Sequence, residues 1–570
     1  MKKIIKYLFL LTGGSFILAS CNDFLDREPL DSVTPDNFFF TENDLAAYAV
    51  KHYNFTTHEG FNAGIWKNDN ATDNQAATDY DKKWIPGQWK VPEAYDNPAS
   101  NDPWYFSAIR EANYFLETVV PRFEKGEIEG SETNIKHYIG EMYFLRAKNY
   151  LSKLETFGDF PIIKNTLPDE SESLIQASKR APRYKVAHFI LEDLDQAISL
   201  LTNNISGGKN RITKNAALLL KSRAALFEAS WLTYHKGTAL VPGGPGWPGK
   251  AEDIADFNID TEIAFFLKEA KAAAKEVIGN AALVQNTAKD CMDETVKTDE
   301  DKYKMSNPYF AQFSANSLEG YSEILMWRAY NLLDYKIVHS APFYIRVGGN
   351  TGFTRQYIES FLCRDGKPIY ATDQYKGDES LSDVRKNRDL RLQLFLMTSG
   401  ETLSPNVMNG TPDLLPEVPQ LLDITEKRCV TGYQVRKGLS GNWYRDGNTA
   451  IEGCPVYRAA EAYLNYIEAD CMEHNGTSIG SEAAGYWGDL RERAGLPRDY
   501  TVTVNNTDLS KELDWAIYSA GKLVSPLLYN IRRERRCELL AEGLRMLDLK
   551  RWRALDQVKQ FVIQGVNLWE

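Results

Sequence analysis

The chain has 570 residues, of which 66 are Lys or Arg and 78 are Asp or Glu, so its net charge is −12 at pH 7. An acidic surface repels nucleic acid and anionic lipid, so neither is expected as a partner. Aromatic residues are abundant, with 12 Trp, 30 Tyr and 26 Phe, and exposed rings of this kind make ligand platforms.

The first thirty residues predict a secreted protein that is anchored by lipid. Lys2, Lys3 and Lys6 precede an apolar run over residues 7–18, which small residues and Cys21 follow. The run is shorter than the ~20 apolar residues that span a bilayer, so it indicates a cleaved secretory signal. The cysteine at the cut resembles a bacterial lipobox, in which Cys21 is diacylated and becomes the new N-terminus. An ordinary signal with a chance cysteine is the alternative. Two acyl chains suffice for stable anchoring.

Helical patterns follow the signal. Thr41 can cap a helix that runs to about Phe55. A strong pattern over Asn134–Leu154 ends at Gly158, with Pro161 beyond it. Three further helices are predicted over residues 186–201, 216–231 and 263–277. Their faces mix small and large apolar residues, which is typical of tetratricopeptide-like helix pairs, although long insertions keep the repeat length from being constant.

Aromatic residues outside the helical patterns are the candidate ligand platforms. A sugar ring has an apolar C–H face that stacks on Trp or Tyr, and its hydroxyls bond to Asn, Asp and Arg. Residues 60–105 mix four Trp with Asn and Asp, and a stiff Pro- and Gly-rich loop at 241–250 presents another Trp. Some of these rings are expected to pack beneath the loops. The candidate ligand-binding residues are Trp66, Trp84, Trp89, Trp247, Trp327 and Tyr330.

Two short motifs look catalytic but fit other interpretations better. The 241–250 loop matches G-x-G-x-x-G, yet no strand precedes it, and Pro245 and Pro248 remove amide donors. Residues 476–480 match G-x-S-x-G but follow a helix, so Gly476 is interpreted as a helix stop. The six cysteines besides Cys21 form no C-x-x-C pair. We expect no enzyme and no cofactor, and a structural calcium ion stays open.

The C-terminal part is predicted to return to helices. One helix begins at Pro455 with Tyr457 on its core face, after short extended pieces at 367–370 and 432–435. The last helix runs over Leu528–Trp552. Its dense charged face, which includes Glu538, is interpreted as a structural ion network rather than a binding site.

The C-terminal run from Asn530 to Gly543, continued by Arg545, Asp548 and residues 549–552, resembles the signature of the SusD/RagB family of outer-membrane nutrient-binding lipoproteins. Each further match is weak alone, but the ordered set is specific. The further matches follow the order that they have in the family. They are the lipobox and residues 140–147, 158–161, 214–217, 365–368, 431–433 and 460–465.

The resemblance implies a mostly α fold, in which tetratricopeptide-like helix pairs form a scaffold beside a loop-rich ligand face with a few short strands. It implies a signal peptide at 1–20, a tether at 21–40 and a single body at 41–570, whose C-terminal part begins near residue 300 and is intertwined with the N-terminal part. Family chains commonly run well past the final signature, whereas this sequence ends at Glu570, so truncation stays open.

The implied function is capture of an oligosaccharide at the cell exterior for a SusC-like TonB-dependent outer-membrane transporter. A peptide ligand, as in RagB-like proteins, is the alternative. A surface glycoside hydrolase is a lesser one, because it needs two carboxylates ~5–10 Å apart, and 78 acidic residues leave such a pair open.

Overall fold

The computed structural model describes residues 38–79, 81, 104–287, 307–334, 336–398, 402–404, 413–414, 420–440, 449–558 and 562–568. Within these ranges the protein is mostly helical and its strands are short, so the predicted fold class is confirmed. No described helix combines the length and apolar character that crossing a bilayer requires. Cys21, Trp84 and Trp89 lie outside the described ranges.

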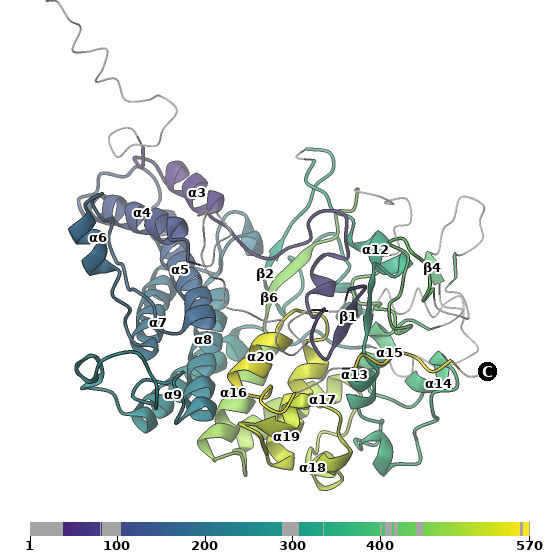
Figure 1. Ribbon diagram of the computed structural model, residues 1–570. Coiled ribbons are helices and arrows are strands. Elements are labelled where there is room, and N and C mark those ends of the chain that lie inside the picture. Colours follow the sequence, from purple (N-terminus) through teal and green to yellow (C-terminus); the bar gives the residue numbers. More distant parts are fainter. Residues whose placement is uncertain are drawn as a thin grey trace, which may run out of the picture.

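The N-terminal half forms a stack of long helices, on the left of Figure 1. Neighbours along the chain pack together, α4 on α5, α5 on α7, α7 on α8 and α8 on α9. The four helices predicted from apolar spacing are present within a few residues of their predicted limits. The stack consists of α3 (Glu42–Lys51), α4 (Ser107–Glu124), α5 (Glu132–Phe157), α7 (Arg183–Leu200), α8 (Lys214–His235) and α9 (Ile259–Asn280).

Small residues allow this close packing. Along α8, Ala216, Ala224 and Ala229 expose at most 3% of their surface, because α7 and α9 cover the helix from both sides. On α5, a Cβ atom at Gly140 would lie only 3.0 Å from Cγ of Leu201, at the end of α7. A larger residue at Gly140 would therefore push the two helices apart.

The predicted helix signals act as expected. The Thr41 hydroxyl accepts a hydrogen bond from the Asp44 amide, and the Asp44 carboxylate accepts one from the Thr41 amide, which makes a capping box at the start of α3. Gly158 ends α5 with φ 71°. Gly476 has φ 74°, and its amide donates to the carbonyl of Cys471, so this glycine is a helix stop.

The C-terminal half adds a second helical group, at the lower centre of Figure 1. Its first helix packs against both α8 and α9 and thereby joins the two halves. The group comprises α16 (Ala460–Glu473), α17 (Ser481–Arg493), α18 (Thr501–Asn505), α19 (Pro526–Glu538) and α20 (Arg545–Arg551).

Shorter helices complete the fold. They are α6 (Ser171–Ala177), α11 (Pro308–Ala311), α12 (Ala341–Val347), α13 (Arg355–Ser360), α14 (Leu381–Arg385) and α15 (Leu390–Phe395). Single 3-10 turns cover Gly64–Lys67, Gly208–Asn210, Ala251–Ile254, Ile369–Ala371, Leu509–Lys511 and Trp515–Ile517.

The described strands form two-stranded antiparallel pairs, two of which join segments that are far apart in the sequence. β1 (Gln75–Ala77) pairs with β3 (Thr351–Phe353), with Gln75 opposite Phe353. β2 (Ile324–Arg328) pairs with β6 (Cys454–Arg458). The other pairs are β4 (Thr402–Ser404) with β5 (Asp413–Leu414) and β7 (Tyr518–Ser519) with β8 (Lys522–Leu523).

Three predicted elements are wrong. Pro455 starts no helix, because residues 454–458 form β6 against β2, and α16 begins only at Ala460. The helix predicted over Leu528–Trp552 is broken into α19 and α20. Ala541 and Gly543 have φ of 60° and 79° there, and a left-handed backbone cannot continue a right-handed helix. Residues 367–370, predicted as extended, enter a 3-10 turn.

The charged face of α19 is a buried ion network, which confirms the structural interpretation. The Glu538 carboxylate accepts hydrogen bonds from Arg458 (2.8 Å), Arg493 (2.7 Å) and Arg391 (3.2 Å), and from the Tyr309 hydroxyl (3.1 Å). Burial would raise the pKa of Glu538, but the three guanidinium charges outweigh burial and lower this pKa below its ordinary value. Glu538 is therefore the shared counter-charge of three buried arginines.

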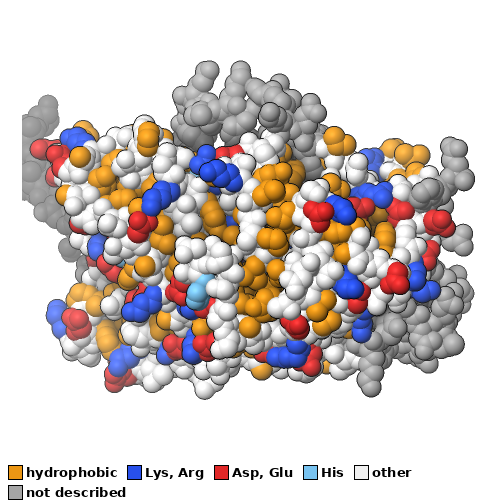
Figure 2. All heavy atoms as spheres, turned by 90° about the horizontal axis from the view of Figure 1, so that it is seen from below, with side chains coloured by type: hydrophobic (Ala, Val, Ile, Leu, Met, Phe, Trp, Pro, Cys, Tyr) orange, Lys and Arg blue, Asp and Glu red, His pale blue; other side chains and the backbone are white. Residues whose placement is uncertain are grey.

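The face seen from below in Figure 2 mixes Lys and Arg with Asp and Glu side chains, with hydrophobic patches between them. Among the described residues on that face, neither sign of charge gathers into a continuous patch of the kind that binds a polyanion.

His235, at the end of α8, gives a pH prediction. Its ring is buried, stacks on Trp231 and leaves Nδ1 without a partner, and burial lowers its pKa to about 4. Unfolding restores the ordinary pKa of about 6.5, so the unfolded chain binds more protons as the pH falls below that value. Between about pH 7.5 and about pH 5, His235 is expected to remove about 2 kcal/mol from the free energy of unfolding.

The measurement is urea unfolding at both pH values, compared with His235→Gln. The glutamine amide keeps a donor for the Lys550 carbonyl, to which Nε2 of His235 is bonded. The raised pKa values of Glu155 and Asp69 act in the opposite direction but are common to both proteins. An equal pH slope in the two proteins would contradict the prediction.

Candidate functional site

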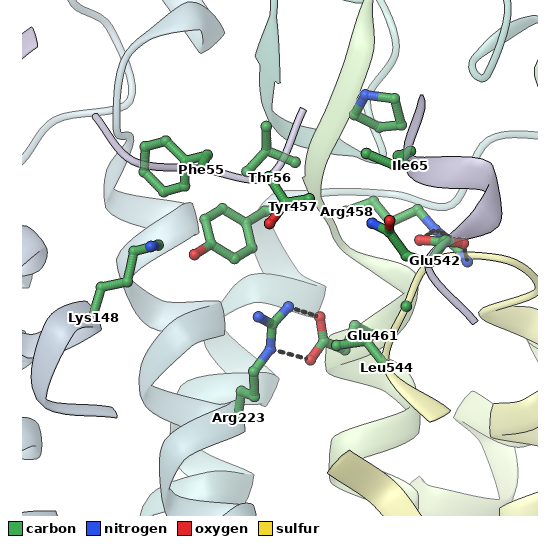
Figure 3. Close-up of a pocket in the computed structure, with 14 residues that line it drawn as sticks. Phe55, Thr56, Ile65, Lys148, Arg223, Tyr457, Arg458, Glu461, Glu542 and Leu544 are labelled. Atoms are coloured by element: carbon green, nitrogen blue, oxygen red, sulfur yellow. Dashed lines mark hydrogen bonds and ion pairs between the residues drawn. The ribbon is translucent and has the colours of Figure 1, made fainter. Parts of the chain in front are cut away.

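A cavity of about 220 Å³ lies where the two helical groups meet. We call it the junction cavity. The segment after α3 and the helices α5 and α8 form one side, and β6, α16 and the turn between α19 and α20 form the other (Figure 3). Its lining includes Phe55, Ile65, Asn68, Lys148, Arg223, Tyr457, Arg458, Glu461, Glu542 and Leu544.

Two aromatic rings form one wall of the junction cavity. The rings of Phe55 and Tyr457 meet edge to face, with centroids 6.0 Å apart. Tyr457 is only 5% exposed, and no described residue bonds to its hydroxyl, which points toward Lys148 in Figure 3. Burial raises the pKa of Tyr457 to about 12, so the phenol stays protonated. The hydroxyl oxygen itself is open to the cavity, so a ligand there can bond to it.

An arginine–carboxylate pair forms the floor. Nε and Nη2 of Arg223 donate to the two oxygens of Glu461 at 2.7 and 2.6 Å. The guanidinium also lies 5.2 Å from the centroid of the Tyr457 ring. The remaining nitrogen, Nη1, donates to no described residue. Because both Glu461 oxygens are occupied, this carboxylate is not a free general acid or base.

Lys148 enters from α5. Its ammonium donates to the backbone and side-chain oxygens of Asn54 at 2.9 and 3.0 Å and keeps one N–H unused. Burial lowers the pKa of Lys148 to about 8. Two turns further along α5, burial raises the pKa of Glu155 to about 7. Glu155 lines a smaller cavity of about 20 Å³, which shares Arg223 and Leu544 with the junction cavity.

A wider groove of about 670 Å³ lies between the start of α4 and α6. Trp104 and Phe106 line it, but the Trp104 ring already packs against Phe160 and under the guanidinium of Arg180, 4.7 Å away. The helix α6 beside it buries none of its residues. The groove therefore offers space, but the Trp104 ring that lines it is already packed on other side chains.

The described residues contain no group of three or more His, Cys, Asp and Glu side chains arranged to hold a metal ion. Five of the cysteines, Cys363, Cys429, Cys454, Cys471 and Cys537, are buried and free.

Two family models match the chain. The model described as "SusD family" matches residues 296–565, and the one described as "Starch-binding associating with outer membrane" matches residues 23–226. The chain belongs to the SusD-like family. SusD-like protein P2 of Formosa agariphila is 25% identical over 95% of this chain and 89% of its own.

Solved structures share the fold. A SusD-like protein from Bacteroides fragilis NCTC 9343 superposes with a TM-score of 0.61 and 22% identity, over 93% of this chain and 89% of that one. A SusD-like carbohydrate binding protein from the same organism has a TM-score of 0.59 and 18% identity, over 93% and 90%. A third, solved with xylogluco-oligosaccharide, has a TM-score of 0.51 and 17% identity, over 90% and 82%.

In this SusD-like protein, three predicted ligand rings are packing residues. Trp66 is 1% exposed and lies edge-on to Phe313 in the core. Trp327 is 5% exposed and donates to Glu319, and Tyr330 is 8% exposed and donates to the backbone of His58. None of the three offers an open ring face in this conformation, which corrects the expectation drawn from their loop-like sequence.

The other three ring predictions stay predictions. Trp247 is half-buried in its loop, and its indole N–H donates to Asp159 at 2.8 Å. Trp84 and Trp89 lie outside the described residues.

The acidic and amide residues near Trp66 serve the scaffold. Asp73 pairs with Arg545 and Arg536, and Asn74 accepts a hydrogen bond from Arg536. Both are at most 2% exposed. Asp73 and Asn74 therefore hold the N-terminal segment to α19 and α20, whereas Asn68 lines the junction cavity.

Sequence analysis missed Lys148, Arg223 and Tyr457 as site residues. Tyr457 was assigned to the core face of a helix, whereas in β6 it packs beside Phe55. Both helices carry other basic residues, such as Arg146 in α5 and Lys221 in α8, so no signal in the sequence sets Lys148 and Arg223 apart.

Proposed function

We propose that this SusD-like protein is a lipid-anchored, cell-surface protein that binds a glycan and delivers it to a SusC-like TonB-dependent outer-membrane transporter. The observation that carries glycan binding is the junction cavity, where the Tyr457 hydroxyl, to which no described residue bonds, lies beside the Phe55 ring and the cationic groups of Lys148 and Arg223. Aromatic walls with a few polar groups suit a sugar, which has both a C–H face and hydroxyls.

The comparisons support the same class of ligand. One matching family model is described as starch-binding, and two fold neighbours are described as carbohydrate binding or were solved with a xylogluco-oligosaccharide. A cavity of about 220 Å³ is below the usual size of sites for drug-sized ligands, so it suits one sugar ring, with the rest of the chain extending outward.

Peptide binding and glycoside hydrolysis are the competing functions. The carboxylates that line the junction cavity, Glu461 and Glu542, are held by Arg223 and Arg458, which leaves neither free for acid–base chemistry. The test is calorimetric titration of oligosaccharides and short peptides, with release of reducing ends followed in the same samples. We expect at least one glycan to bind without turnover. Binding of peptides alone, or glycan cleavage, would refute the proposal.

The lipid anchor gives a second test. Cys21→Ala removes the only thiol that the lipobox presents, so the variant is expected to lose acyl labelling and leave the membrane fraction. Ser20→Ala, which keeps the cysteine, is the control. Membrane retention of Cys21→Ala in cells that lack the transporter would contradict lipid anchoring.

The lipid tether supports the proposal of a transporter partner. A body anchored in the same leaflet as its partner stays at high effective concentration, so even a weak interface is occupied. The long-helix stack offers a broad rigid surface for that interface, and ligand contacts with both proteins would favour a closed arrangement. Purification in mild detergent, with ligand affinity measured with and without the transporter, tests this step. A protein that never co-purifies with a transporter would exclude it.

A further inference from the structure

We infer that the junction cavity selects an acidic sugar, binding the anionic group of a uronic acid or a sulfate ester through Lys148, Arg223 and Tyr457. The inference rests on the proposed glycan binding and names the class of glycan.

The charged groups of the junction cavity that keep a free hydrogen-bonding position are donors. Lys148 keeps one N–H after its two bonds to Asn54, and Nη1 of Arg223 bonds to no described residue. The Tyr457 hydroxyl also lacks a described partner, although the residue is 95% buried. Figure 3 shows these groups around one space. An anion accepts from all three, whereas a neutral hydroxyl brings a proton of its own that needs an acceptor.

The carboxylates that line the cavity are already taken, and the side-chain oxygens of Thr56 and Asn68, which also line it, carry no charge. Glu461 receives both of its hydrogen bonds from Arg223, and Glu542 receives Arg458 and Lys437. Glu155 does not line the junction cavity and belongs to the smaller cavity next to it. An anion therefore meets cationic donors that are still available, whereas the carboxylates beside them are already neutralised.

Lys148 also lacks a counter-charge. No described carboxylate lies within ion-pair distance of its ammonium, which bonds to Asn54 and lies 5.2 Å from the centroid of the Phe55 ring. Burial disfavours a cation without a counter-charge, which is why the pKa of Lys148 is about 8. A bound carboxylate or sulfate supplies the missing charge and raises this pKa again.

The charges around the junction cavity make the affinity for an anion depend on pH. Burial holds the pKa of Glu155 at about 7, and Arg223, Lys148 and Lys550 face it. At about pH 6 Glu155 is mostly neutral and Lys148 is charged. At about pH 8 Glu155 is ionised and half of Lys148 has lost its proton, so both changes oppose an anion. Binding of an acidic sugar is therefore expected to be tighter at the lower pH.

The experiment uses the full-length mature protein and four matched probes, which are D-glucuronic acid, its methyl ester, D-glucose 6-sulfate and D-glucose. Ligand-observed NMR gives Kd at about pH 6 and about pH 8. The methyl ester keeps the shape of the uronic acid and removes its charge. We expect at least one anionic probe to bind about tenfold more tightly than the two neutral probes, and the anion that does so identifies carboxylate or sulfate as the source.

Variants then test whether the anionic group binds in the junction cavity. Lys148→Met and Tyr457→Phe are each expected to weaken binding of the anionic probe by about tenfold and to weaken binding of D-glucose by clearly less. Lys136→Met, on the same helix but outside the cavity, is the control. Urea unfolding confirms that each variant is folded, and because the two substitutions are independent, one folded variant is enough for the test.

The outcomes separate this inference from the proposed function. Equal affinity for all four probes overturns the acidic class but leaves glycan binding standing. An anionic probe that binds Lys148→Met and Tyr457→Phe as it binds the original protein overturns the site. If neither these probes nor any glycan in the wider titration binds, the proposed function fails with it.

Discussion

Replacing Glu538 with Gln is expected to lower the free energy of unfolding by about 3–5 kcal/mol, because it leaves three buried guanidinium groups without their shared counter-charge. Arg391, Arg458 and Arg493 all donate to this carboxylate, and each is almost fully buried. Gln has nearly the same size as Glu, so the loss of stability measures the removal of the negative charge rather than a change in side-chain volume. Equilibrium unfolding in urea, followed by circular dichroism, measures it.

The matched control is Glu132→Gln at the exposed start of α5, where the carboxylate pairs with Lys136. Solvent screens that pair, so unfolding is expected to be nearly unchanged. If Glu538→Gln unfolds at the same urea concentration as Glu132→Gln, the buried network does not hold the C-terminal half together.

Trp66→Ala is expected to cost about 3–5 kcal/mol, since it removes one of the largest fully buried side chains. The ring lies edge-on to Phe313, and a Cβ atom at Gly438 would lie 2.1 Å from its Nε1, so the backbone approaches it closely. The cavity left by alanine cannot be filled without moving that backbone. Urea unfolding measures the cost.

Trp247→Ala provides the comparison. This ring is half-buried and holds one hydrogen bond, to Asp159, so its loss is expected to cost about 1 kcal/mol. A Trp66→Ala protein that is as stable as Trp247→Ala but fails to bind any glycan would restore Trp66 as a ligand platform and refute its role in the core.

Local patterns in the sequence were enough to predict the long helices. The apolar spacing that predicts α5, α7, α8 and α9 is a property of residues three and four apart, and the Thr41 cap and Gly158 stop act within one turn. These signals do not depend on which other helix packs against the segment, so the sequence alone was enough to predict the helices.

The site could not be predicted in the same way, because it depends on contacts between distant segments. Tyr457 is in a strand only because β6 pairs with β2, which lies more than a hundred residues earlier. The partners of Glu538 come from α15, β6 and α17, so its spacing within α19 indicates charge but not burial. The core position of Trp66 has the same origin, since Phe313 comes from a remote segment.

The most direct test of the central claim is a crystal structure of the protein with the tightest-binding glycan from the titration. We predict a sugar ring in the junction cavity, against the rings of Phe55 and Tyr457, with an oxygen within hydrogen-bond distance of the Tyr457 hydroxyl and another near the Lys148 ammonium. A glycan bound in the groove beside Trp104, or anywhere else with the junction cavity empty, would contradict the account.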